Sequence, residues 1–244
     1  MRTIFKHKHW IFIDIAFFIS GIMLALSSKD MGYKPYFSGF SIGYHFLNSQ
    51  EELLLPIIMI FFSDLFFNVE YLDGTFLSIL LCGKSKKDWF IQKSVEFLSF
   101  VLTQVLIGFL LMIFAGALVF GRVFPENWSL LFPNMTIVQI VKNIIFSFFA
   151  TYSRVVFFVS IGILSSVLFV GKLFLGSIIS IGVLFAILNL ALRFKNVKAV
   201  KIIVEHTIIL RNINDLVISV LVVCFLFLIS YFIVKKVKIE NTGM

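Results

Sequence analysis

Residues 94–120, SVEFLSFVLTQVLIGFLLMIFAGALVF, decide the fold class of this chain. The stretch holds one charged side chain, Glu96, and is longer than the about 20 helical residues that cross a bilayer core of about 30 Å. An apolar run of this length is typical of a membrane-spanning helix. Its extra length predicts that the helix is tilted or extends beyond the lipid.

The whole chain has the same character. Of its 244 residues, 60% are apolar and 14% are charged, whereas soluble domains average about 45–50% and about 25%. A soluble core of this size would not bury so much apolar surface. The composition excludes a soluble enzyme, a disordered protein and a nucleic-acid-binding protein, although the net charge is +8. We expect an all-α, multi-pass helix bundle in the cell membrane, with residues 1–244 forming a single transmembrane domain.

Six apolar runs are expected to cross the bilayer. Basic residues are more numerous at the ends that are cytoplasmic when the N-terminus is inside, which predicts cytoplasmic N- and C-termini. A seven-span alternative would break the fourth run at Arg154 into two spans of about 17 residues. Trp89 falls near a span edge, where indole rings prefer to lie. The connection over residues 27–52 is rich in Tyr and Phe and is expected to lie on the membrane surface. The six runs are residues 10–26, 53–69, 94–120, 142–170, 173–192 and 216–234.

The connection between the second and third runs carries the most informative polar pattern. Residues 68–93 read NVEYLDGTFLSILLCGKSKKDWFIQK. They predict a short amphipathic helix over residues 75–82 that is capped by Thr75 and ended by Gly83. Phe76, Leu77, Leu80 and Leu81 are expected to share one apolar face of this helix. That face must be buried on lipid or on a partner protein, and composition leaves both open.

At these residues the sequence resembles the permease subunits of ABC type-2 exporters. In that family a Glu, a Gly-Thr pair, a short apolar helix, a turn and a small-plus-basic pair lie between spans two and three. Gly83 stands here where the family usually has Pro. The resemblance implies that the short helix is a coupling helix docking on a cytoplasmic ABC ATPase subunit. The residues expected to take part in coupling are Glu70, Asp73, Gly74, Thr75, Phe76, Leu80, Leu81, Gly83, Ser85 and Lys86.

The chain itself is not expected to hold a nucleotide, a metal or a catalytic site. Gly83-Lys84-Ser85 matches the end of a P-loop, but the first glycine of that motif would fall at position 78, which is Ser78. The four histidines lack metal-ligand spacing. ATP and Mg²⁺ are therefore assigned to the partner ATPase, and this chain is expected to be a transport subunit without enzymatic activity.

Apart from Glu96 and Lys142 at the starts of their runs, three charged residues fall inside predicted spans, where each costs at least about 2.5–3.5 kcal/mol. They are Asp14, Asp64 and Arg154. Asp64 and Arg154 lie at similar distances from the starts of the second and fourth runs, so a rise of about 1.5 Å per residue gives them one depth. An Asp64–Arg154 ion pair is predicted. Positions near the inner interface remain the alternative for Asp14 and Asp64.

The expected function is that of a permease subunit working with a second, identical or homologous permease and two ATPase subunits. The chain is similar to small bacteriocin-immunity and peptide-export permeases, which implies export of an amphipathic peptide, a bacteriocin or another hydrophobic cargo. An integral substrate-binding subunit of an ECF-type importer and a non-transporting membrane anchor are the alternatives. The basic segment 193–215 is expected to lie on lipid headgroups or, alternatively, to gate an outer exit.

Overall fold

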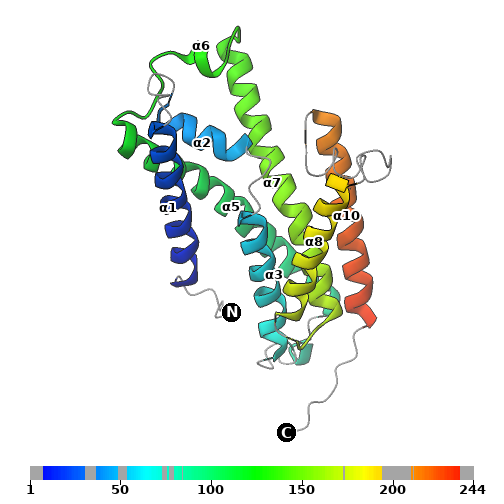
Figure 1. Cartoon of the computed structure of the whole chain (residues 1–244). Helices are drawn as coiled ribbons and strands as arrows, with labels where there is room; N and C mark the ends of the chain where they lie inside the picture. Colours follow the sequence, from blue (N-terminus) through cyan, green and yellow to red (C-terminus); the bar gives the residue numbers. More distant parts are fainter. Residues whose placement is uncertain are drawn as a thin grey trace. The chain divides into compact units, whose positions relative to one another are not determined.

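Helices make up all regular elements of the described residues, which contain no strand. The computed structural model describes residues 8–30, 37–48, 54–72, 76, 80–83, 85–172, 174–193, 210 and 212–236. The predicted all-α class is thereby confirmed (Figure 1). The elements are α1 (Lys8–Asp30), α2 (Gly39–Asn48), α3 (Leu54–Leu72), α5 (Lys86–Phe120), α6 (Trp128–Leu131), α7 (Ile137–Leu168), α8 (Leu175–Arg193) and α10 (Ile213–Lys236).

Four of the described helices are long and apolar enough to cross a membrane. They are α1 over Ile11–Asp30, α5, α7 and α10. Shorter apolar stretches occupy α3 over Leu55–Val69 and α8 over Leu175–Ala186. The helix α7 continues without a break through Arg154, so the break that a seventh span requires is not formed. Each of the six predicted runs lies largely within one helix, and α5 begins eight residues before the predicted start at residue 94.

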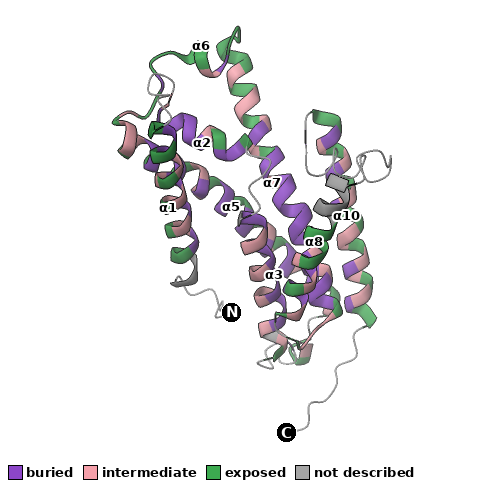
Figure 2. Ribbon diagram, in the orientation of Figure 1, coloured by how far each residue is buried: buried purple, intermediate pink, exposed green. Residues whose placement is uncertain are grey.

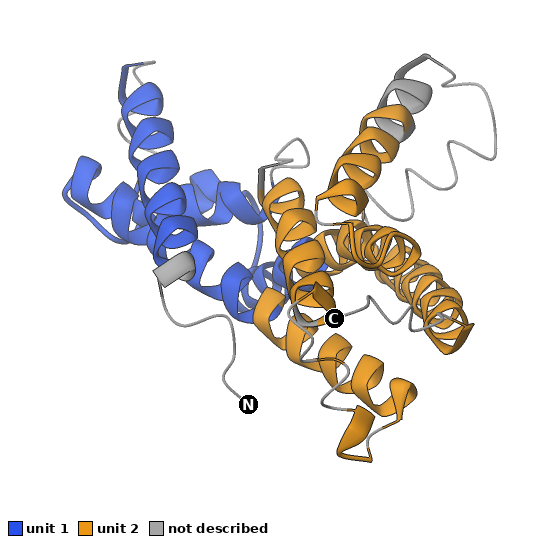
Figure 3. Ribbon diagram, turned by 90° about the horizontal axis from the view of Figure 1, so that it is seen from below, with its two compact units in different colours: residues 1–49, 102–151 blue, residues 50–101, 152–244 orange. Residues whose placement is uncertain are grey.

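The chain divides into two compact units, each with its own core (Figure 3). The first consists of Met1–Ser49 and Leu102–Thr151, and the second of Gln50–Val101 and Tyr152–Met244. The helices α5 and α7 are each divided between the units, with one part in the first unit and the other part in the second. Each unit is described separately below.

In the first unit, α2 is a largely buried helix within the connection 27–52, whose predicted position on the membrane surface stays a prediction (Figure 2). Its small residues explain the burial. A Cβ on Gly39 would lie 2.3 Å from the backbone oxygen of Ile113 in α5, and one on Gly43 would lie 2.5 Å from the Ile113 side chain. Glycines four residues apart let two helix backbones approach closely, as they do in helix pairs inside membranes. The glycine pair therefore seats α2 directly on α5.

The backbone N–H groups at the start of α2 donate hydrogen bonds to acceptors both nearby and far away in the sequence. Ser38 and Ser41 cap each other, with the backbone N–H of each donating to the hydroxyl oxygen of the other at 2.7 and 3.2 Å. The Gly39 N–H then donates to the Arg122 carbonyl oxygen at 3.0 Å. Because helix N-termini leave N–H groups without intrahelical partners, these bonds complete the start of α2.

The long helices α1 and α5 run in the same direction within the first unit. Gly108 of α5 lies against Phe17 of α1, and Gly21, one turn further along α1, lies against Met112 and Ala115. Both helices expose large apolar side chains on other faces, as helices in contact with lipid do. The polar side chain of Gln104 in α5 is also fully buried.

Gln104 supplies a first prediction. Its side chain is fully buried, and within the described part of the chain neither its Oε1 nor its Nε2 has a hydrogen-bond partner. An unsatisfied buried polar group costs about 1–3 kcal/mol, so Gln104→Leu is expected to stabilise the protein by about 1–2 kcal/mol. In a chain of this size that raises the melting temperature by roughly 2–8 °C, measurable by thermal unfolding in detergent.

The matched control for this prediction is Gln92→Leu on the same helix. Gln92 Nε2 donates to Glu96 Oε1 at 2.8 Å, so its replacement removes a made bond and is expected to give no gain. A lower melting temperature for Gln104→Leu than for the parent would show that the amide is satisfied in the membrane and would contradict the prediction.

In the second unit, α3, α7 and α10 run in one direction. At one level, Gly162 of α7 lies against Ser63 of α3, with a Cβ position 2.5 Å from Ser63 Oγ. At another level of α7, Ser153 Oγ lies 2.9 Å from Ser219 Oγ of α10. Toward the C-terminal ends of all three helices, one pocket is lined by Tyr71 of α3, Val167 of α7 and Val234 of α10.

The first part of α5 and the whole of α8 run the opposite way in the second unit. The rings of Phe97 and Phe66 lie 5.2 Å apart, whereas those of Phe100 and Phe62, in the earlier turn of α3, lie 6.1 Å apart. On the other side, the Ser180 hydroxyl donates to the Ile161 carbonyl oxygen at 3.4 Å, while the start of α8 lies against later residues of α7. Helices that are consecutive along the chain thus alternate in direction within this unit.

Candidate functional site: the segment between α3 and α5

The segment that joins α3 to α5 ends in well-defined local structure. Gly83 has φ of +86°, and its N–H donates to the Leu80 carbonyl oxygen at 3.0 Å. A positive φ favours glycine, so Gly83 forms the turn predicted at the end of the short helix. Ser85 then caps α5, because its hydroxyl accepts from the Asp88 N–H at 3.1 Å and contacts Asp88 Oδ2 at 2.6 Å.

Phe76 anchors this segment in the second unit. Its side chain is 5% exposed, and its ring lies 4.7 Å from the Trp89 ring and 5.7 Å from the Tyr71 ring. Phe67 completes the cluster, with its ring 5.9 Å from that of Trp89. Aromatic pairs at these separations add about 0.5–1.5 kcal/mol to the burial of their area. The cluster therefore fixes the segment to the ends of α3 and α5.

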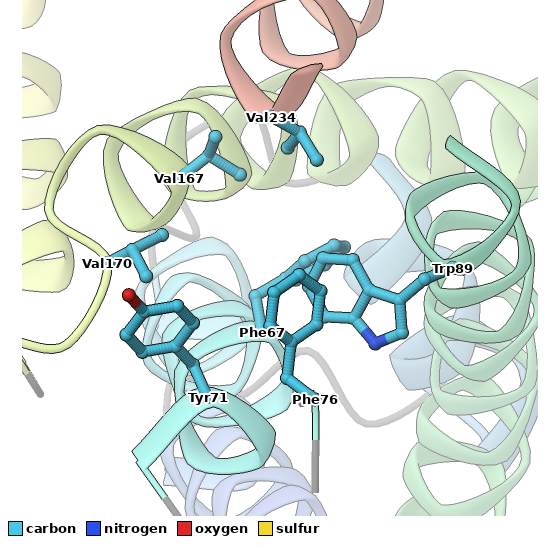
Figure 4. A pocket seen from close by; sticks show the side chains of 7 residues that line it. All are labelled: Phe67, Tyr71, Phe76, Trp89, Val167, Val170 and Val234. Carbon is cyan, nitrogen blue, oxygen red and sulfur yellow. The ribbon is translucent and has the colours of Figure 1, made fainter. Parts of the chain in front are cut away.

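A small apolar pocket lies beside Phe76 (Figure 4). It is the meeting point of the C-terminal ends of α3, α7 and α10 with the start of α5. Its walls are hydrocarbon and aromatic, and the Tyr71 hydroxyl points to one side of it in the view of Figure 4. A displacement of Phe76 would therefore change the packing at the ends of four helices. The lining residues are Phe67, Tyr71, Phe76, Trp89, Val167, Val170 and Val234.

The other side of the segment is open. Leu81 is 80% exposed, and Cys82, Gly83 and Ser85 are also exposed. Phe76 and Leu81 therefore do not share the single apolar face expected from the sequence. The segment thus has one side buried in the unit and another side available to a partner.

The remaining predicted coupling residues have mixed outcomes. Leu80 is helical and half-buried, and Lys86 is the first residue of α5. Glu70 belongs to α3, but its side chain lies outside the described part. The other three predicted residues, Asp73, Gly74 and Thr75, lie outside the described residues, as does most of the predicted segment 193–215.

Asp64 is the centre of a second polar cluster in the same unit. Its side chain is fully buried, and its Oδ2 accepts from the Ser177 hydroxyl at 3.1 Å and the Ser177 N–H at 3.4 Å. Asn68, one turn further along α3, donates its Nδ2–H to Asp64 Oδ1. Asn68 Oδ1 accepts from the Gly171 N–H at 3.4 Å. The two side chains thus connect α3 to the turn between α7 and α8 and to the start of α8.

Arg154 lies at a different level from Asp64. Gly162 of α7 is the residue that faces Ser63, and Arg154 lies eight residues earlier, about 12 Å along the helix axis. The equal depth expected from residue counts does not hold, because Ser63 is the tenth residue of α3 whereas Gly162, which faces it, is the twenty-sixth residue of α7. Arg154 itself is 6% exposed. Among the contacts described for Asp64, its partners are Asn68 and Ser177.

The sequence analysis did not identify the roles of Trp89 or of the uncharged residues Asn68 and Ser177 at these sites. Trp89 was expected near a span edge, and its burial beneath Phe76 at 7% exposure was not predicted. Asn68 and Ser177 are uncharged, so a search for charges inside spans passed over them. The spacing of Asp64 and Asn68 at i and i+4, which places both on one face of a helix, was the available signal.

Comparison with known proteins yields no relative. No protein-family model, no curated protein and no solved structure matches the chain.

Proposed function

We propose that this chain is the permease subunit of an ABC type-2 exporter, and that the segment from Phe76 to Gly83 docks on its ATPase. One observation carries the proposal. Phe76 is buried against Trp89 and Tyr71, while Leu81, five residues later, is 80% exposed. A connection between two apolar helices that is anchored on one side and exposed on the other suits a docking element. The resemblance of residues 70–86 to the coupling region of that family supports the same assignment.

The geometry suggests how a displacement of the docking segment would reach the transmembrane helices. Closure of the ATPase subunits would displace the segment, and Phe76 would move within the pocket formed by the ends of four helices. Packed interiors respond to such displacement by shifting whole helices, because they are not continuously deformable. The helices would rock together and alternate access to a path between permease subunits.

Six membrane crossings fit this proposal. The helices α3 and α8 have 19 residues each, or about 28 Å at about 1.5 Å per residue, close to the hydrocarbon thickness of about 30 Å. Together with the four longer helices they would make six spans. The alternating directions within the second unit are those that successive crossings require. The excess of basic residues then favours cytoplasmic termini in the cell membrane.

The partners follow from the same proposal. The ATPase subunits carry ATP and Mg²⁺, and a second permease, identical or homologous, completes the transport path. The cargo class is an amphipathic peptide, a bacteriocin or another hydrophobic molecule, in line with the small permeases that the sequence resembles.

Leu81→Asp tests the docking surface. The tagged chain is purified from its native membranes in mild detergent, and vanadate-sensitive ATP hydrolysis in the preparation is measured. We expect the parent chain to bring ATPase activity with it. Leu81→Asp places a charge on the proposed contact, which costs about 2–4 kcal/mol at the centre of an interface and should reduce the retained activity at least about thirtyfold.

Leu130→Asp is the matched control, because Leu130 is a 46% exposed leucine on α6. It should retain the ATPase activity. The proposal fails if the parent chain carries no ATPase, or if both substitutions reduce the activity equally. A lone chain that holds a small ligand would instead support the importer subunit.

A further inference from the structure

We propose that Asp64 and Asn68 form a clamp between α3 and α8, so that the two helices move as one body when the segment 76–83 is displaced. The clamp is a feature of the second unit alone. The movement rests on the proposed function, whereas the clamp does not. Asp64 and Asn68 are positioning residues here, since neither touches a cargo or a nucleotide.

The first half of the clamp is the contact of Asp64 with the start of α8. Ser177 is the third residue of that helix, and its N–H belongs to the first turn, which has no intrahelical acceptor. Asp64 Oδ2 accepts both this N–H and the Ser177 hydroxyl. A carboxylate at a helix N-terminus also interacts favourably with the helix dipole. Asp64 thus caps α8 from a neighbouring helix.

The second half is Asn68, which holds the turn that precedes α8. Its Oδ1 accepts from the N–H of Gly171, a residue with φ of +84°. Its Nδ2 donates back to the Asp64 carboxylate, so each side chain orients the other. Both side chains are fully buried, and in lipid no water would replace these bonds if they broke. The turn and the helix start are therefore held together on one face of α3.

Close packing makes the connection stiff. A Cβ on Gly176 would lie 2.9 Å from the Ser166 backbone nitrogen and 3.1 Å from Asp64 Oδ1. A Cβ on Gly162 would meet Ser63 Oγ at 2.5 Å. Small residues thus bring α3, α7 and α8 into direct contact at the level of the clamp. The helices have no space here in which to slide past one another.

The same helix links the clamp to the docking segment. Tyr71 lies less than one turn beyond Asn68 on α3, and its ring contacts that of Phe76 at 5.7 Å. A displacement of Phe76 therefore acts on the end of α3, and the clamp transmits the displacement to α8. Without the clamp, packing contacts alone would have to transmit the displacement from α3 to α8, and the movement of α8 should decrease.

The experiment replaces the clamp by a disulfide in a chain whose two cysteines, Cys82 and Cys224, are first changed to Ser. Asp64→Cys with Ser177→Cys should cross-link with mild oxidant in membranes, since the hydrogen bond between the two native side chains makes these positions direct neighbours across α3 and α8. Asp64→Cys with Ser180→Cys is the control pair and should react at least about tenfold more slowly, because Ser180 lies three residues further along α8. Equal rates, or no cross-link in either pair, would overturn the clamp whatever the ATPase result.

Movement is then read from a spin label on Ile178→Cys, a 61% exposed position at the start of α8, introduced separately with Asp64→Asn or with Ser230→Ala. Ser230 is a buried serine that bonds within its own helix, at 2.9 Å to the Leu226 carbonyl oxygen. In the assembled complex, vanadate with ATP should change the spectrum of the Ser230→Ala chain, and this change should be lost in Asp64→Asn.

The possible outcomes separate the two proposals. An unchanged spectral response in Asp64→Asn overturns the coupled movement, although the docking of the ATPase stands. A response missing from the Ser230→Ala control, in a preparation that hydrolyses ATP, overturns it equally. If no ATPase accompanies the chain, the proposed function fails, and the clamp is judged by the cross-linking pairs alone.

Discussion

Gly39→Ala is expected to destabilise the protein by about 3 kcal/mol or more and to lower its melting temperature by roughly 6–12 °C. The added methyl group would lie 2.3 Å from the Ile113 backbone oxygen, and 3.0 Å from Ala117. No side chain can turn away to relieve the first contact, because it is made with the backbone of α5. The helix α2 would have to move away from α5 and break the bonds of its first turn to Arg122 and Val123.

Gly182→Ala on α8 is the matched control, because nothing lies within 4 Å of the added carbon. Alanine is a better helix former than glycine, so this substitution should be neutral or stabilise by about 0.5–1 kcal/mol. Thermal unfolding of both variants in the same detergent makes the comparison. If the two variants melt within 2 °C of each other, α2 does not rest on α5 through Gly39.

A second glycine extends the test. Gly116 lies opposite Gly39, and its added carbon would be 2.9 Å from the Gly39 Cα. Because the two glycines share one contact, the effects of Gly39→Ala and Gly116→Ala should not add. Once α2 has been displaced by the first substitution, the second should cost little more.

The sequence predicted the features that depend on long apolar runs. It indicated an all-helical membrane protein, and the six runs correspond to α1, α3, α5, α7, α8 and α10. These signals are strong because a helix in lipid must be apolar over most of its length. Helix ends were less well predicted, since caps such as Ser85 with Asp88 or Asn212 with Asp215 extend helices beyond their apolar parts.

Features that depend on small or uncharged residues were missed. Gly39 and Gly43 carry no hydrophobic signal, so the close packing of α2 on α5 was not predicted. The partners of Asp64 were expected among charges, although a carboxylate is equally satisfied by an amide, a hydroxyl and a backbone N–H. Trp89 has the residue type of an interface position, and only its packing against Phe76 reveals its role.

Phe76→Ala is expected to release the docking segment from the second unit while the rest of the helix bundle stays folded. Truncating a buried Phe costs about 3–5 kcal/mol, and here the loss falls on a short connection that few other described contacts hold. The indole of Trp89, 4.7 Å from the Phe76 ring, would then become exposed. In a chain with Trp10→Phe and Trp128→Phe, where Trp89 is the remaining tryptophan, its emission should shift to longer wavelength.

The same change should weaken the docking of an ATPase, because Leu81 would no longer be held in one orientation and its ordering would have to be supplied on binding. Phe76→Leu retains most of the apolar volume and should restore both the Trp89 emission and most of the ATPase activity. Phe225→Ala removes a Phe that is 62% exposed on α10 and should affect neither. An unchanged Trp89 emission in Phe76→Ala would show that Phe76 does not anchor the segment. A shifted emission with full ATPase activity would show instead that docking does not require the anchor, because the two measurements report on opposite sides of the same segment.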